Sequence, residues 1–187
     1  MRNPPEHMGR RTAVLAVLVL AAGLLVVVPA TAQTNERRAT EEHCVAVAVD
    51  QAADGELVVS EPQCFATKAE AADAVAALTT AAPSDSANAG SPGLQVPLST
   101  MTLGIHYDGT GGTGSSISIT GSGCTGGYWN ASAYWTNRIS STWNGCYQVK
   151  HYDFAGKVGS SYSTYTVGQI DSLSWFSNDT GSVSYHS

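Results

Sequence analysis

Alternating apolar and polar residues predict short β-strands along the second half of the chain. Ile117 and Ile119 are separated by polar residues, and Val183 and Tyr185 repeat this pattern near the end. Alternation with period two is typical of strands that bury one face. Clusters of glycine and serine separate the alternating runs, as in a sandwich of short strands. We therefore expect an all-β domain over residues 98–187.

The first half of the chain predicts a β-hairpin. Valine-rich segments at 44–49 and 57–60 flank an Asp-Gly dipeptide at 54–55. Valine favours strands, and Asp-Gly favours a tight turn between them. Cys44 and Cys64 lie at equal distances on either side of this turn, so an antiparallel hairpin places them opposite each other.

A short helix is expected directly after the hairpin. Thr67 and Glu70 have the spacing of a capping box, in which each side chain bonds to the backbone of the other residue. An alanine-rich segment over 68–78 follows, and alanine has the highest helix propensity. The region 33–80 is therefore expected to be a small, acidic, disulfide-closed hairpin and helix.

The N-terminus has the features of a secretory signal. Arginines precede an apolar run at 13–28, and small residues at 30–32 provide a cleavage position after Ala32. The run is short for a membrane span of about 20 residues, although an uncleaved anchor is the alternative. The arginine pair at 10–11 also allows the twin-arginine export route. We expect a secreted, extracellular protein that is not associated with a membrane after cleavage.

Composition supports a division into four regions and argues against one class of partner. The chain has 187 residues and a formal net charge of −6, whereas a broad nucleic-acid surface requires an excess of Lys and Arg. We therefore expect no nucleic-acid partner. The segment 81–97 contains Pro, Gly, Ser and Ala without apolar periodicity, which is typical of a flexible linker. The predicted regions are the signal peptide (1–32), the hairpin and helix region (33–80), the linker (81–97) and the β domain (98–187).

The β domain contains an internal repeat. The segments 106–118 and 151–163 are identical at eight of thirteen positions, and each begins with His-Tyr-Asp. Two copies of about 40 residues indicate a pseudo-symmetric domain. Within each triplet, Tyr107 and Tyr152 are expected to be core or corner residues of a strand.

These motifs resemble those of the βγ-crystallin Greek-key family. Segments 107–114 and 152–159 keep the family's first Tyr and last Gly, although Gly112 and Lys157 replace the expected aromatic residue. The segment 135–141 resembles the later family motif of an aromatic residue, two Asx positions and a Ser pair. The resemblance covers half of the chain and implies a Greek-key sandwich of two pseudo-repeats.

Among secreted bacterial proteins of this family, the chain looks most similar to the metalloproteinase inhibitors. The resemblance implies that the partner is an extracellular peptidase. The glycine-rich segment 121–129 is the candidate surface for binding it. A protease-binding loop works best when it is rigid, because little entropy is then lost on docking. The expected protease contacts are Gly123, Thr125, Tyr128 and Trp129. Two other functions remain open, namely a structural module and a toxin-like antimicrobial protein.

The same resemblance implies a weak calcium site, with no required cofactor. The candidate ligands are Asn137, Ser141, Asn178, Asp179 and Ser182. Calcium prefers about six to eight oxygen ligands, with carboxylates among them, and this set has one carboxylate. The alternative is that these residues only cap turns.

The four cysteines are expected to form disulfides, because export favours oxidation. Four cysteines allow three pairings, and the domain boundary favours Cys44–Cys64 and Cys124–Cys146. No Ser or Cys stands out beside a base as a nucleophile, and the β domain contains no Glu. We therefore expect a protein without enzymatic activity.

Overall fold

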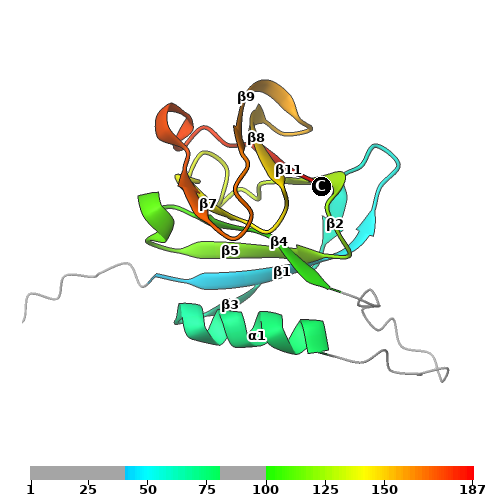
Figure 1. Cartoon of the computed structure of the whole chain (residues 1–187), viewed down its shortest axis with the longest axis vertical. Coiled ribbons are helices and arrows are strands. Elements are labelled where there is room, and N and C mark those ends of the chain that lie inside the picture. Colours follow the sequence, from blue (N-terminus) through cyan, green and yellow to red (C-terminus); the bar gives the residue numbers. More distant parts are fainter. Residues whose placement is uncertain (1–40, 81–99) are drawn as a thin grey trace, which may run out of the picture. The chain divides into compact units, whose positions relative to one another are not determined.

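The computed structural model describes residues 41–80 and 100–187. The predicted signal peptide and the whole predicted linker lie outside these residues. No helix in the described part is long and apolar enough to cross a membrane. Strands dominate the fold, as expected (Figure 1). In chain order they are β1 (His43–Gln51), β2 (Leu57–Val59), β3 (Gln63–Phe65), β4 (Met101–Tyr107), β5 (Ser116–Gly121), β6 (Thr125–Asn130), β7 (Ser141–Asn144), β8 (Gln148–Phe154), β9 (Val158–Thr164), β10 (Ile170–Ser172) and β11 (Ser182–His186).

The strands form two sheets. The larger has the order β10-β7-β4-β5-β1-β2, with β3 also paired to β1, and the smaller has the order β6-β11-β8-β9. The larger sheet therefore combines β1–β3, β4, β5 and β7 with β10, and the smaller combines β8, β9 and β11 with β6. In these sheets His106 pairs with Ile117 and Thr142, and His151 pairs with Tyr162 and Val183.

The predicted hairpin forms and becomes part of the larger sheet. Strand β1 pairs antiparallel with β2 and β3, which places Cys44 opposite Cys64. Its other edge pairs in parallel with β5 from His43↔Ser116 to Val47↔Thr120. Residues 41–80 therefore share a continuous sheet with the β domain.

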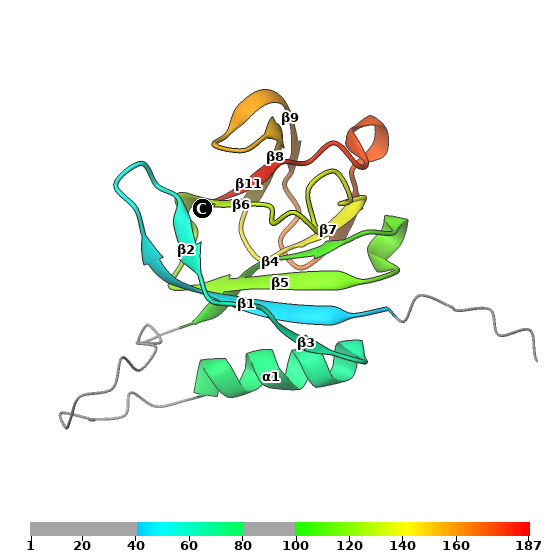
Figure 2. The ribbon, with the colours of Figure 1, turned by 180° about the vertical axis from the view of Figure 1, so that it is seen from behind.

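The described residues contain one α-helix, α1 (Lys68–Thr80), which lies beside β1 on the side away from the smaller sheet (Figures 1 and 2). The predicted capping box is confirmed: the Thr67 backbone N–H donates to the Glu70 carboxylate at 3.1 Å, and the Glu70 N–H donates to Thr67 Oγ1 at 3.2 Å. The Lys68 ammonium donates to the carbonyl of Gly112 at 2.6 Å. This bond connects the start of the helix to the β4–β5 connection.

Histidines, rather than tyrosines, enter the core between the sheets. His106 and His151 are fully buried, and the His106 ring stacks on Trp129 with centroids 5.7 Å apart. Tyr107 is buried on the opposite face of its strand, under the Lys68 ammonium, and Tyr152 is only partly buried. The expectation of a core or corner tyrosine is confirmed for Tyr107, which is buried, whereas Tyr152 is only partly buried. The space between the sheets is entered by the preceding histidines, because successive side chains of a strand point to opposite faces.

His106 and His151 belong to one hydrogen-bond network. The Thr142 hydroxyl lies 3.0 Å from His106 Nδ1 and 3.0 Å from His151 Nε2. His106 Nε2 lies 2.9 Å from the Tyr185 hydroxyl, and His151 Nδ1 lies 3.3 Å from the Thr180 hydroxyl. Burial lowers the pKa of His151 to about 3. Burial, followed by the neighbouring His151, holds the pKa of His106 well below its ordinary value.

Candidate functional site

Both predicted disulfides are present in the structure. Cys44 is bonded to Cys64, and Cys124 is bonded to Cys146. The second bond ties the β5–β6 loop to the segment that leads into β8. Because β5 and β6 belong to different sheets, the loop is held by both sheets as well as by the covalent bond.

Only part of the expected protease-contact set is on the surface. Thr125 is exposed and Gly123 is partly exposed. Tyr128 and Trp129 are only 4% and 3% exposed, so the expectation that they are surface anchors is wrong. Large aromatic side chains gain more by burial, and Trp129 packs against His106 in the core. The surface available at this loop is therefore Ser122–Thr125.

Tyr128 has a positioning role between the β1–β2 hairpin and β6. Its backbone N–H donates to the Gly55 carbonyl at 2.9 Å, and its hydroxyl donates to the Asp54 carboxylate at 3.0 Å. Hydrogen bonds from the Glu56 N–H and then from Tyr128 lower the pKa of Asp54. Tyr128 thus connects the hairpin to β6, next to the β5–β6 loop that the Cys124–Cys146 bond holds, which we call the tethered loop.

A small pocket lies where the hairpin and the tethered loop meet. Its volume is about 210 Å³. Pockets for drug-sized ligands measure about 300–1,000 Å³, so this one is the size of a single side chain. Its lining consists of Ala48, Val49, Asp50, Gln51, Leu57, Leu103, Gly121, Ser122, Gly123 and Thr125.

The proposed calcium ligands lie partly around a crossing of two loops. Asn137 and Asn178 both have left-handed backbones, with φ of 57° and 65°. The Asn137 N–H donates to the Thr180 carbonyl, and the Asn178 N–H donates to the Ile139 carbonyl, both at 2.9 Å. The structure therefore brings the equivalent motifs of the two repeats together at this crossing.

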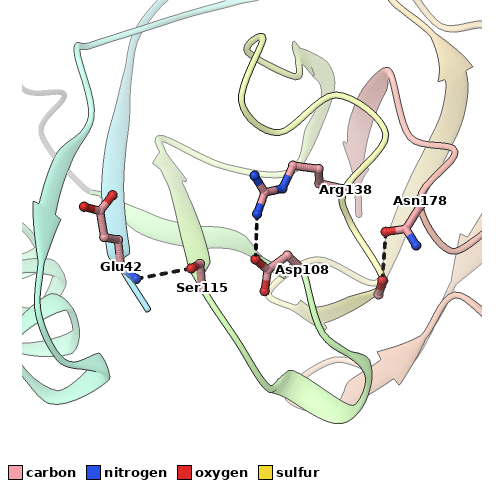
Figure 3. A network of polar contacts seen from close by, with 6 residues as sticks. Glu42, Asp108, Ser115, Arg138 and Asn178 are labelled. Atoms are coloured by element: carbon pink, nitrogen blue, oxygen red, sulfur yellow. Dashed lines mark hydrogen bonds and ion pairs between the residues drawn. The ribbon is translucent and has the colours of Figure 1, made fainter. Parts of the chain in front are cut away.

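Other polar contacts brace the first repeat near the same crossing. The Ser140 hydroxyl donates to Asn178 Oδ1 at 3.1 Å, and the Arg138 guanidinium forms an ion pair with the Asp108 carboxylate at 3.1 Å (Figure 3). The Glu42 N–H donates to the Ser115 hydroxyl at 3.2 Å. These bonds connect segments that are far apart in the sequence.

The two serines of the calcium set are used elsewhere. The Ser141 hydroxyl donates to the Gly109 carbonyl at 2.6 Å and accepts from the Gly112 N–H at 2.9 Å. The Ser182 hydroxyl donates to the Phe154 carbonyl at 2.7 Å and accepts from the Lys157 N–H at 3.0 Å. Each serine thus closes the turn that opens its own repeat.

This arrangement does not favour the predicted calcium site. Both serine hydroxyls already donate to backbone carbonyls, and one Asn178 oxygen already accepts a hydrogen bond. The remaining carboxylate, Asp179, is exposed. Calcium prefers about six to eight oxygens, and in this geometry three of the five side chains are already engaged in hydrogen bonds.

Replacing either serine by alanine is expected to lower the free energy of unfolding. Ser141→Ala and Ser182→Ala each remove two hydrogen bonds from a buried serine to a turn whose partner groups are buried or partly buried, at a cost of about 1–3 kcal/mol. Urea denaturation measures both. Thr136→Ala, which removes a hydroxyl that bonds at the exposed 131–132 backbone, is the control and should cost less. Serine variants as stable as wild type would contradict the assigned role.

The described residues contain one group with the spacing of metal ligands, made of Glu42, Cys44 and Cys64. Its two cysteines are joined in a disulfide and supply no thiolate. His106 and His151, which open the repeats, are fully buried and cannot reach a substrate from solvent. These positions therefore do not form an accessible catalytic group.

The fold and the site were compared with known proteins. No family model, curated protein or solved structure matches the chain.

Sequence reasoning missed the pocket, because its hairpin wall meets the loop only through the long-range pairing of β1 with β5. The acidic side chains of the hairpin were the sequence feature that could have indicated a binding site there.

Proposed function

We propose that this chain is a secreted inhibitor of an extracellular peptidase, of the zinc metalloproteinase class. The observation that carries this proposal is the exposed segment Ser122–Thr125, held between two sheets and tied by the Cys124–Cys146 bond. Such a segment loses little conformational entropy when it docks, which is what an inhibitory loop requires.

The sheet topology supports a βγ-crystallin-like Greek-key pair as the scaffold. Strands β4, β5, β6 and β7 of the first repeat correspond to β8, β9, β10 and β11 of the second. In each case the third strand joins the sheet of the other repeat. The equivalent hydrogen bonds of Ser141 and Ser182 agree with this correspondence.

Secretion is supported by two disulfides and by the signal features of the first 32 residues. Stable disulfides are typical of oxidising compartments outside the cytoplasm. All buried side-chain polar atoms in the described residues have hydrogen-bond partners. A fully satisfied interior suits a rigid binding scaffold, and it equally suits the structural module that is the alternative function.

The test is a titration of peptidase activity. The full chain is expressed, the oxidised protein is purified from the medium, and it is added to a thermolysin-type zinc peptidase and, in parallel, to a serine peptidase. We expect activity of the zinc enzyme to fall linearly to zero near an equimolar ratio, with the serine enzyme as the class control. Unchanged activity of both enzymes would overturn the proposal and favour the structural module.

A further inference from the structure

Two glycines in the wall of the pocket beside the tethered loop have different surroundings. A Cβ built on Gly121 would lie 3.1 Å from Leu103 and 3.2 Å from the Ala48 Cβ, so this position is crowded and a side chain would displace its neighbours. A Cβ on Gly123, which also lines the pocket, would meet nothing within 4 Å. Gly123 is therefore the wall position at which an added side chain enters open space.

The lining combines an apolar base with a carboxylate. Leu103 is 1% exposed, and Leu57 packs partly against the core. Asp50 and Gln51 contribute polar groups, and one Asp50 oxygen accepts from the Gln51 N–H at 2.7 Å. Asp50 forms no ion pair with any of the described residues. An apolar base beside an unpaired carboxylate matches a side chain with an aliphatic stem and a cationic end.

The charge around the pocket also favours a cation. Residues 41–80 contain eight acidic residues and one lysine. The hairpin wall itself carries Asp50, Asp54 and Glu56, without any Lys or Arg. A concave site lined by one sign of charge raises the local concentration of the opposite sign.

The chain already places one of its own cations against the tip of this hairpin. The Lys157 ammonium lies 4.6 Å from the centre of the Tyr128 ring, and it would lie 3.9 Å from a Cβ on Gly55. This cation therefore lies beside the acidic tip, near the Gln51 side of the pocket wall, but Lys157 does not itself line the pocket.

We propose that the pocket binds a lysine or arginine side chain presented by the polypeptide that docks on Ser122–Thr125. The aliphatic stem would lie along Leu57 and Leu103, and the charged end would reach Asp50. The identity of that polypeptide as a peptidase rests on the proposed function, but recognition of a basic side chain can be measured without any peptidase.

The test uses two blocked tripeptides, Gly-Arg-Gly and its citrulline analogue, which has the same shape without the charge. Binding to the oxidised full chain is followed by amide chemical shifts in ¹H–¹⁵N NMR spectra. We expect shifts at Asp50, Gly121 and Gly123, with the arginine peptide binding about two- to fivefold more tightly, as for an exposed ion pair. Added salt should reduce this preference.

Variants measure separately how the charge of Asp50 and the space in the pocket contribute to peptide binding. Asp50→Asn should abolish the preference for arginine, whereas Asp73→Asn, the same change at an exposed α1 residue outside the lining, should leave it intact. Gly123→Leu should weaken both peptides, because the new side chain enters open space at a position without a left-handed backbone. Circular dichroism checks that each variant folds.

Either of two results would overturn the inference, namely equal binding of the two peptides or shifts confined to residues outside the pocket. The outcome is also distinct from that of the inhibition assay. A preference for the arginine peptide without loss of peptidase activity would refute the inhibitory function and support the binding site. Inhibition that is unaffected by Asp50→Asn, with no preference between the peptides, would refute the binding site and support the inhibitory function.

Discussion

Lowering the pH from 6.5 toward 3 is expected to remove about 5 kcal/mol from the free energy of unfolding through His151 alone. The pKa of this residue falls from 6.5 to about 3 on folding, and each pKa unit corresponds to about 1.4 kcal/mol. Between these values the unfolded chain binds a proton that the folded chain does not, so stability is complete above pH 6.5 and declines with falling pH. His106, whose pKa is lowered for the same reason, acts in the same direction.

Urea denaturation between pH 7 and pH 4.5 measures this effect before most carboxylates titrate. Below pH 6.5, His151 should contribute a slope that approaches about 1.4 kcal/mol per pH unit, and His106 should add to it in the same direction. NMR of the native protein is the second measurement, because the imidazole signals of His106 and His151 should not titrate over this range. A flat stability profile, or native titration near pH 6.5, would show that the two rings are accessible to protons in the folded state.

Removing the Cys124–Cys146 bond is expected to cost about 3 kcal/mol of stability and to abolish inhibition. The bond closes a loop with a sequence separation of 22 residues, for which loop-closure entropy gives about this value. In a Cys124→Ser/Cys146→Ser variant, the segment Ser122–Thr125 keeps its residues but loses its covalent tether. The inhibition constant should therefore rise even at temperatures where the variant remains folded.

The matched control is Cys44→Ser/Cys64→Ser. This bond has a similar sequence separation of 20 residues, so the loss of stability should be comparable. It lies between β1 and β3, away from the β5–β6 loop, and inhibition should be retained. Equal loss of inhibition in both variants would mean that general stability, rather than the tethered loop, determines the effect.

Features that depend on neighbouring residues could be predicted from the sequence. The Asp-Gly turn brings Cys44 opposite Cys64, and the Thr67–Glu70 capping box starts α1 where expected. Both depend on backbone propensities and hydrogen bonds within a few residues. Alternation likewise located β5 and β11, because one face of each strand is apolar.

Features that depend on long-range pairing could not be predicted in the same way. Apolar periodicity indicated Tyr107, which is buried, but it could not indicate His106, because a histidine is polar and yet this one is fully buried. Burial of Trp129 is decided by the partner ring of His106 in the other sheet, which sequence spacing does not reveal. The pocket requires the parallel pairing of β1 with β5, whose residues are more than seventy positions apart.

The position of β1 has a consequence for a chain cut between residues 80 and 100. Neither disulfide would link the two pieces, since Cys44–Cys64 lies in one and Cys124–Cys146 in the other. Strand β1 would nevertheless remain paired with β5 at five positions, with Cys44 and Ala46 in the shared core. Such a nicked protein would be a non-covalent heterodimer of two fragments, each supplying strands that complete the other's sheet.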